Sequence, residues 1–272
     1  MNDNERLVLE IDQVTKRFGP IVALDNVSIR LRAGEVLGII GDNGAGKSTL
    51  VSIMSGTARA DEGRVLVDGI ERTFHSPADA RNAGVETIFQ NLALIPTLGI
   101  SENVFLGREK FLAGFLGQVF RIMNKRAMRR ETHLGFERLG VRLPALKSKV
   151  GSLSGGQRQA VAIGRSVMWG SHIVIMDEPA AALGVEQTEI VLSLVERLRE
   201  QGVGVILISH NMQHVLRVAD RVVVMRLGRK VAELDIDGQT TGTGLVGLIT
   251  GAIEGTTSIP PRAPQKNQIT PT

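Results

Sequence analysis

The chain has 272 residues, a net charge of +4 and no cysteine. Its length allows one large α/β domain or two smaller ones, and the lack of cysteine excludes disulfide scaffolds, iron–sulfur clusters, thiolate zinc sites and cysteine nucleophiles. The sequence pI of about 9.7 is weak evidence for a polyanionic partner, because a chain without Tyr or Cys has few groups besides lysine that lose a proton before arginine does. Residues 1–10 have no apolar core, so we expect no signal peptide.

Alternating apolar and polar residues near the N-terminus predict a half-buried sheet. Within residues 27–31, apolar side chains alternate with polar ones, which is the period of a strand with one buried face. Residues 7–14 are a plausible partner strand, and a short run at 64–68 ends in an Asp-Gly turn signal. These segments indicate an antiparallel β layer.

Continuous apolar runs predict a second sheet of a different kind. The runs are rich in β-branched residues and do not alternate, which is typical of parallel strands covered on both faces. The segment from about 101 to 166 has no such run, and we interpret it as a helical insertion. The apolar runs are 36–40, 85–89, 173–176, 203–208 and 221–225.

The expected architecture is one α/β domain of residues 1–253. It has a mixed, mainly parallel sheet as its core, an antiparallel β layer and a helical subdomain of about residues 92–166. After residue 253 the chain is rich in Thr, Pro and Gln without apolar periodicity, so we expect a disordered tail at 254–272. The most apolar stretch, residues 111–120, is about half as long as a membrane-spanning helix.

A glycine-rich segment follows the apolar run at 36–40. The spacing of its glycines and Lys47 fits a phosphate-binding loop between a strand and a helix. Glycines let successive backbone N–H groups point at phosphate oxygens, and the helix N-terminus adds its positive dipole end. Lys47 would contact the β- and γ-phosphates and Ser48 would bind Mg²⁺; a chance glycine-rich turn is the alternative. The predicted nucleotide-binding residues of this loop are Gly41, Asn43, Gly44, Ala45, Gly46, Lys47, Ser48 and Thr49.

Two acidic residues end the apolar run at 173–176. At the carboxyl edge of a parallel sheet, Asp177 would hold the metal and Glu178 would orient water for attack on the γ-phosphate. The alternative is an acidic N-cap of the next helix, which Pro179 makes plausible. The phosphate-binding loop in the same chain favours the catalytic interpretation.

The sequence Leu-Ser-Gly-Gly-Gln at residues 153–157 indicates a second anion site. Its glycines expose backbone amides, and the apolar spacing that follows predicts a helix beginning there. Because the first phosphate-binding loop is already complete, we infer a dimer in which each nucleotide is held by one loop from each subunit. The residues of this second loop that would contact the nucleotide are Ser154, Gly155, Gly156 and Gln157.

Taken together, the motifs resemble the nucleotide-binding domains of ABC transporters, which are P-loop NTPases. The resemblance covers roughly residues 5–250. Within the family, the segments 41–44, 90–92 and 106–109 are similar to ATP-binding subunits of monosaccharide importers of the ribose, xylose and fructose type. Such importers often fuse two ATPase domains in one chain, so the single domain here implies a homodimer. The motifs are, in chain order, 41–49, Gln90, 153–157, 173–178 and His210.

The resemblance implies roles for three further residues. Gln90 would contact Mg²⁺ and the attacking water while sensing the permease, and His210 would hold the γ-phosphate. Phe18 occupies the position of an aromatic residue that stacks on adenine. Each has a plainer alternative, because a Gln or His at a strand end can be a solvated loop residue and Phe18 can belong to the core.

Two residues depart from the family pattern. Gly184 stands where the family usually has an Asp that links the two active sites of the dimer, and Ala180 stands where Thr is common. Neither change excludes catalysis, but both put a carboxylate link between the sites in doubt.

The resemblance implies an ATP-hydrolysing, energy-coupling subunit of an ABC importer for a monosaccharide, with ATP and Mg²⁺ as cofactors. Its expected partners are a second copy, integral-membrane permease subunits and, indirectly, a sugar-binding protein, with no nucleic acid. It would lie in the cytoplasm, peripheral on the inner face of the cell membrane. The alternatives are a soluble ABC-type ATPase not coupled to transport, and an ABC ATPase for a different substrate.

A basic cluster follows the apolar stretch 111–120. A solvated helix face beside a core strip is the plain interpretation. The functional one is a docking surface, together with Gln90, for a membrane permease and for anionic headgroups. The cations are Arg121, Lys125, Arg126, Arg129 and Arg130.

Overall fold

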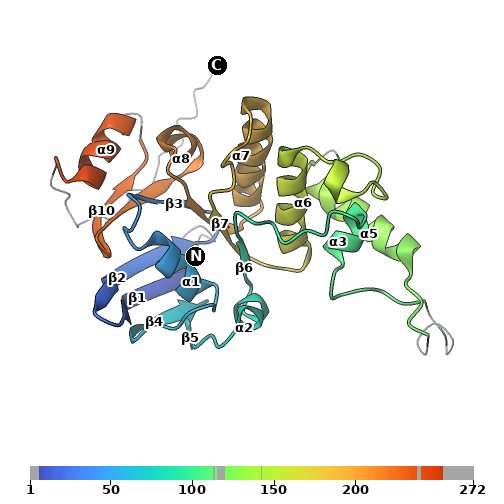
Figure 1. The fold of residues 1–272 in the computed structure, drawn as a ribbon, viewed down its shortest axis with the longest axis horizontal. Helices are drawn as coiled ribbons and strands as arrows, with labels where there is room; N and C mark the ends of the chain where they lie inside the picture. Colours follow the sequence, from blue (N-terminus) through green and yellow to red (C-terminus); the bar gives the residue numbers. More distant parts are fainter. Residues whose placement is uncertain (1–5, 113, 115–119, 142, 238–239, 254–272) are drawn as a thin grey trace, which may run out of the picture.

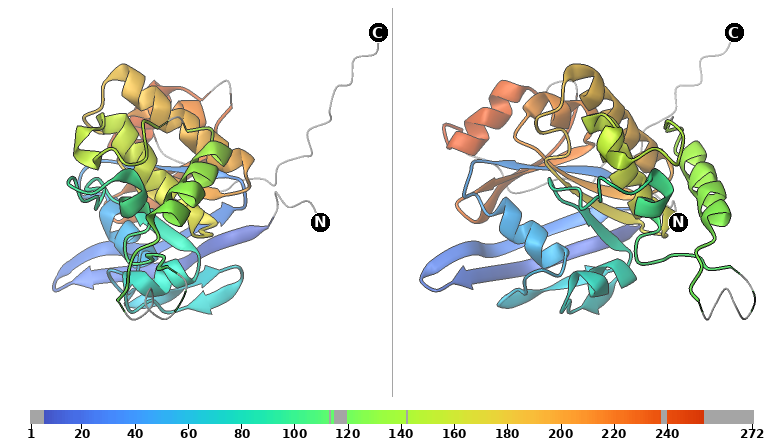
Figure 2. Two further views of the ribbon diagram at one scale, coloured as in Figure 1. Left: turned by 90° about the vertical axis from the view of Figure 1, so that its right-hand side faces the viewer. Right: turned by 45° about the vertical axis from the view of Figure 1, so that its right-hand side comes forward.

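The computed structural model describes residues 6–253, except 113, 115–119, 142 and 238–239. Two sheets lie one above the other with helices between and around them (Figures 1 and 2). In the part that the structure describes, no helix combines the length and the apolarity needed to cross a membrane. The tail at 254–272, for which we predict disorder, lies outside the described residues.

The first sheet is the predicted antiparallel layer. Residues 27–31 alternate between buried and more exposed positions, as the sequence pattern indicates. The first strand continues to Phe18, past the predicted end at residue 14, because its far half still pairs with the neighbouring strand, Phe18 opposite Ile21. In spatial order the strands are β2 (Ile21–Arg32), β1 (Leu7–Phe18), β4 (Glu62–Val67) and β5 (Ile70–Arg72).

The second sheet contains all five predicted apolar runs, and its parallel pairing confirms the expected α/β fold. One edge strand, β10, was not predicted and pairs antiparallel with its neighbour. The other adjacent strands all pair in parallel. In spatial order the strands are β10 (Arg229–Asp235), β9 (Arg221–Arg226), β3 (Val36–Gly41), β8 (Gly204–Ile208), β7 (Ile173–Asp177) and β6 (Val85–Ile88).

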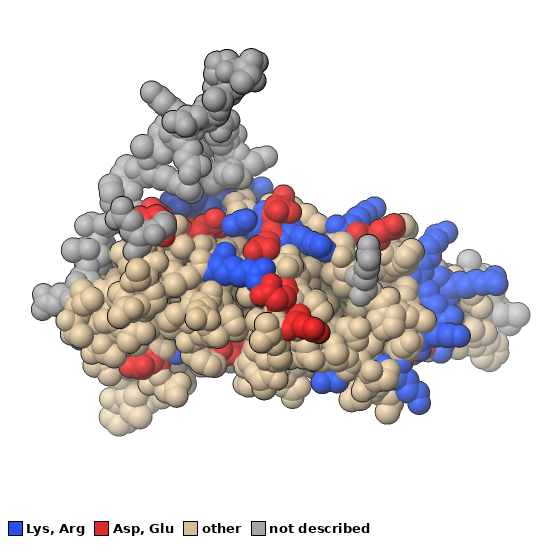
Figure 3. All heavy atoms as spheres, turned by 90° about the horizontal axis from the view of Figure 1, so that it is seen from above, with Lys and Arg blue, Asp and Glu red and all other residues tan. Residues whose placement is uncertain are grey.

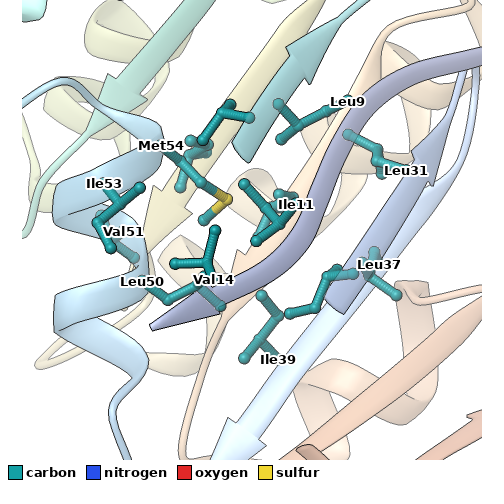
Figure 4. Packing of buried hydrophobic residues seen from close by; sticks show 14 of the residues in the cluster. Leu9, Ile11, Val14, Leu31, Leu37, Ile39, Leu50, Val51, Ile53 and Met54 are labelled. Carbon is teal, nitrogen blue, oxygen red and sulfur yellow. The ribbon is translucent and has the colours of Figure 1, made fainter. Parts of the chain in front are cut away.

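The helix α1 (Lys47–Met54) lies between the two sheets. Its apolar residues are buried on both sides because each sheet turns one apolar face toward it. Figure 4 shows Leu50 and Met54 of this helix pointing toward Ile11 and Val14 of β1. This packing fixes the start of α1, directly after β3, with respect to the parallel sheet.

Helices cover the other face of the parallel sheet and form a second buried cluster with it. Among its described residues, the segment between β6 and β7 holds the helices α3, α5 and α6 and a short 3-10 turn, η2 (Val150–Ser152), around a third apolar cluster. The predicted boundaries of one domain at 1–253 and of a helical subdomain at 92–166 stay predictions. The helices are α2 (Pro77–Asn82), α3 (Ile100–Val104), α5 (Lys125–Arg138), α6 (Gly155–Met168), α7 (Val185–Glu200), α8 (Met212–Val218) and α9 (Gly242–Thr250).

The described residues at the two ends of the apolar stretch 111–120 are not helical. Phe111 and Met123 form an isolated antiparallel bridge, so the described ends of the stretch belong to two paired arms. Gly114 has φ +99°, a conformation that ends a helix and that glycine adopts without strain. Phe115 and Leu116 lie outside the described residues.

Candidate functional site

Four adjacent parallel strands bring the predicted site residues to one edge of the sheet. The order β3, β8, β7, β6 is continuous, and parallel strands end at the same edge. The loop with Lys47 follows β3, His210 follows β8, Glu178 follows β7 and Gln90 follows β6. Chain segments more than 100 residues apart therefore meet along this edge.

The loop between β3 and α1 has the backbone of an anion site. Gly46 forms the N-cap of α1 with φ 99°, no side chain caps the helix there, and its first turn holds no acidic residue. A Cβ at Gly46 would lie 2.7 Å from the Ala23 carbonyl oxygen, so only glycine fits. An uncapped helix N-terminus reached by such a loop is the usual place for a phosphate.

Lys47 lies inside this loop with its ammonium facing backbone oxygens. Its Nζ donates to the carbonyl oxygens of Gly41, at 2.7 Å, and Asp42, at 2.9 Å. Burial lowers the pKa of Lys47, while the carboxylates of Glu178, Asp177 and Asp42 act in the opposite direction. A half-buried cation beside an uncapped helix N-terminus can bind a polyanion such as a nucleoside triphosphate.

Asp177 and Glu178 lie side by side at the end of β7. Burial raises the pKa of Asp177, with the Glu178 carboxylate adding to the effect and Lys47 opposing it. Glu178 has φ 52°, a left-handed conformation that non-glycine residues adopt rarely and that often marks a functional position. His210 contacts Glu178 Oε1 through both its backbone nitrogen and its Nδ1, each at 2.9 Å.

The donor set at this edge fits Mg²⁺ bound together with a nucleotide. Mg²⁺ takes one or two protein oxygens and completes its shell with phosphate oxygens and water. Ser48, exposed in the first turn of α1, and Asp177 provide a hydroxyl and a carboxyl of that kind. Among the described residues, no cluster of three or more His, Cys, Asp or Glu could form a metal cage.

The second predicted loop starts α6. Ser154 is the N-cap, its Oγ accepts from the Gln157 N–H at 3.2 Å, and the Gln157 side chain accepts in return from the Ser154 N–H at 3.0 Å. Within the described residues, no hydrogen bond or ion pair joins 154–157 to the loop at 41–47. Within one copy of the chain, the described residues of these two loops are therefore not linked by a hydrogen bond or an ion pair.

The two glycines of this loop have a packing role that the sequence does not reveal. A Cβ at Gly155 would lie 2.6 Å from Leu183 Cδ2, and one at Gly156 would lie 3.0 Å from the Gln187 backbone oxygen. The start of α6 thus lies directly against the start of α7. Exposed amides, on which the sequence analysis relied, are only part of the reason for glycine here.

Phe18 and Gln90 are both exposed, as a ligand contact requires. The Phe18 ring, at the end of β1, is 53% exposed, and Lys16 Nζ lies 5.4 Å from its centroid. Gln90 lies two residues past β6. The exposed ring of Phe18 does not fit the alternative of a core residue.

Arg165, which no sequence motif singles out, holds the segment after Gln90. From the last turn of α6, its guanidinium donates to the carbonyl oxygens of Ala93, at 3.2 Å, and Leu92, at 3.4 Å. Burial lowers the pKa of Arg165, and Glu86 of β6 opposes that effect. The one signal in the sequence is a cation within an otherwise small and apolar stretch of helix.

Residues 180–183 line a cavity of about 610 Å³ together with Glu178 and His210. Gly184 is the N-cap of α7 without a side-chain cap, and space is open around its Cα. His214, which no sequence motif singles out either, lies at this cavity; burial lowers its pKa and the neighbouring His210 adds to the effect.

Comparison with known proteins points in the same direction as the geometry. The family model for ABC transporters matches residues 24–181. The fructose import ATP-binding protein FrcA of Rhizobium meliloti is 43% identical over 256 residues, which cover 94% of this chain and 96% of that protein. The xylose/arabinose import ATP-binding protein XylG of Sulfolobus acidocaldarius is 45% identical over 222 residues, 82% of this chain and 86% of that protein.

Solved structures agree with the fold. The ADP conformation of MJ1267, an ATP-binding cassette of an ABC transporter, has a TM-score of 0.75 and 30% identity, covering 90% of this chain and 95% of that one. The dimeric structure of MJ0796, a bacterial ABC transporter cassette, has a TM-score of 0.68 and 26% identity, covering 85% and 99%.

Proposed function

The chain belongs to the ABC transporter family of ATP-binding proteins, and from this premise we propose that it is the ATP-hydrolysing, energy-coupling subunit of a monosaccharide importer. The observation that carries the proposal is the similarity over 94% of the chain to a fructose import ATP-binding protein. The loops along the edge of the parallel sheet supply groups of the kind that ATP hydrolysis needs. A soluble ATPase not coupled to transport is less favoured, because both relatives matched over most of their length are import proteins.

In this proposal the residues at the sheet edge have separate roles in binding the phosphates, binding the metal and activating water. The loop at 41–49 binds the phosphates through its amides and Lys47, and Ser48 and Asp177 hold Mg²⁺ with Gln90 nearby. Glu178 acts as the general base toward water, and His210 contacts the γ-phosphate. Mg²⁺, when bound, neutralises charge that develops on the phosphate oxygens.

The proposed working unit is a homodimer with two composite sites. Residues 154–157 of one subunit would close on the nucleotide bound at Lys47 of the other, since among the described residues no hydrogen bond or ion pair joins the two loops within one subunit. Mixing Lys47→Ala with Ser154→Ala subunits tests this: a mixed dimer has one site that lacks both groups and one intact site. ATPase activity should therefore reappear on mixing two inactive proteins. No recovery, together with a Glu178→Gln protein that stays monomeric in light scattering at saturating ATP, contradicts the dimer.

The proposed partner is an integral-membrane permease served by a sugar-binding protein, which places the chain at the inner face of the membrane. The exposed Gln90, next to the helices between β6 and β7, is the expected point of contact. The test is reconstitution of the chain with its co-encoded permease in vesicles and measurement of sugar-dependent ATPase activity and uptake. Fructose, xylose, arabinose and ribose form the first panel, after the relatives. ATPase activity that no permease and no sugar changes would contradict the proposal.

A further inference from the structure

Two short paired segments of non-helical backbone lie between α3 and α5. Their described residues, 110–112 and 120–124, are called the arm below. The Leu112 N–H donates to the Ile122 carbonyl oxygen at 2.8 Å, and the Asn124 N–H donates to the Lys110 carbonyl oxygen at 2.6 Å. Figures 1 and 2 show the arm extending from α5 at one end of the molecule. It lies apart from the loops at the sheet edge.

The arm exposes large apolar side chains. Phe120 is 68% exposed, Ile122 48%, Leu112 42% and Met123 41%. Opposite Met123, the Phe111 ring is covered by a cation, with Arg121 Cζ 5.2 Å from its centroid. Neighbouring exposed apolar side chains of this size in a folded chain mark a surface that binds an apolar partner, such as a membrane or another protein.

The first turns of α5, which follow the arm directly, present arginines. Arg126, Arg129 and Arg130 are spaced three and four residues apart, so they share one side of the helix. All three are exposed, and none forms an ion pair with a described residue. Two nearby lysines do: Lys110 pairs with Glu131 at 2.6 Å and Lys125 with Glu102 at 2.7 Å.

The unpaired arginines and the apolar arm together form one surface. In Figure 3, Lys and Arg side chains gather at the end of the molecule where α5 lies. Cations beside exposed aromatic and aliphatic side chains suit a membrane interface, where apolar groups enter the headgroup boundary and cations meet anionic lipids. Two short paired segments offer little area for a rigid partner to complement, whereas a fluid lipid surface conforms to them.

We propose that the arm and the arginine face of α5 bind an anionic lipid surface directly. The contact goes beyond the proposed function, since it needs neither nucleotide nor permease. It would hold the chain at the membrane before and between encounters with the permease. Phe120 and Ile122 supply the apolar contact, and Arg121, Arg126 and Arg130 supply the charge.

Flotation of the full chain with lipid vesicles tests the proposal. The chain should float with vesicles in which a third of the phosphatidylcholine is replaced by phosphatidylglycerol, not with phosphatidylcholine alone, and salt should weaken the binding. Arg126→Gln with Arg130→Gln should lower the partition coefficient about 25-fold, about fivefold for each cation lost. Phe120→Ser should lower it about tenfold without a change in charge.

The matched control is Arg72→Gln with Arg81→Gln, which removes the same charge from exposed positions on β5 and α2, two elements that lie apart from the arm in Figure 1. It should float like the wild type, and all variants should keep the ATPase rate of the soluble chain, so that a failure of the proposed function is recognised separately. The proposal is overturned if the wild type stays off anionic vesicles at low salt, or if arm and control variants float alike. Loss of permease copurification without any vesicle binding would also overturn it and assign the arm to a protein partner.

Discussion

Glu178 and His210 are linked by a double contact across the sheet edge. The His210 N–H donates to Glu178 Oε1 at 2.9 Å, and His210 Nδ1 lies 2.9 Å from the same oxygen. The carboxylate is mostly buried, whereas the imidazole is 73% exposed. Glu178 is thus enclosed by the protein, whereas His210 is open to a ligand. A group bound at His210 would therefore lie close to Glu178, the proposed base.

Replacing Glu178 by Gln should lower ATP turnover by about 10²–10⁴-fold, the usual contribution of a positioned general base. Gln keeps an oxygen that can accept the His210 N–H, so ATP affinity should change little. Turnover and ATP binding are measured on the same protein. Glu189→Gln, at the same cavity, is the control and should stay near wild type; equal rates for the two variants would remove Glu178 from this role.

Replacing Arg165 by Leu should release the segment after Gln90 from α6, because the hydrogen bonds to the Leu92 and Ala93 carbonyl oxygens are lost. Two backbone carbonyls lose a charged donor, which should cost about 2 kcal/mol of unfolding free energy. If Arg165 positions this segment, the permease-stimulated ATPase rate should fall more than the basal rate does. Arg165→Lys keeps the charge but not the two-pronged geometry, so it should restore part of the stimulation.

An equal fall in both rates would leave Arg165 with a role in stability alone. Circular dichroism melting of both variants separates loss of fold from loss of coupling. Full stimulation in Arg165→Leu would contradict the positioning role.

The main elements of the fold could be predicted because buried strands carry their signal locally. The runs that became β3, β7 and β8 are apolar throughout, and each is followed by a motif. The charged strand β10 has no such run and is a strand because it pairs with β9. The described residues of the arm are paired and not helical, a difference that apolar content alone does not predict.

The residue types of the candidate site could be predicted, but their neighbours could not. The motifs identify Lys47, Glu178 and His210, whereas their order along the edge depends on strand pairing between distant segments. The positions of Arg165 and His214 depend on how α6 and α8 pack. Packing contacts of this kind between distant segments cannot be predicted from the pattern of a single sequence.

Neutralising Glu86 should stabilise the chain at neutral pH. Burial raises the pKa of Glu86, although Arg81, Arg165 and Arg108 act in the opposite direction. The folded state therefore holds this proton more tightly than the unfolded state, and stability falls as pH rises from the ordinary glutamate pKa, about 4.3, to the raised one. Glu86→Gln removes that penalty.

The melting temperature of Glu86→Gln should thus exceed that of the wild type at neutral pH, and the difference should fade below about pH 4. Glu71→Gln, exposed on β5, serves as the control and should change little at either pH. A wild type that melts above Glu86→Gln at neutral pH would show that the arginines around Glu86 outweigh its burial.

Adding one methyl group at Gly156 should destabilise the chain more than adding it at Gly184. At Gly156 the new Cβ would lie 3.0 Å from the Gln187 backbone oxygen, so α6 and α7 must move apart at a cost of about 1–3 kcal/mol. At Gly184 the space is open, and Ala in place of Gly at an N-cap costs about 0.5 kcal/mol. Urea unfolding of Gly156→Ala and Gly184→Ala compares the two. Similar urea midpoints for the two variants would contradict this prediction and show that the start of α6 can shift freely against α7. A lower midpoint for Gly156→Ala, together with lower ATP turnover, would show that the second phosphate-binding loop needs the close spacing of α6 and α7.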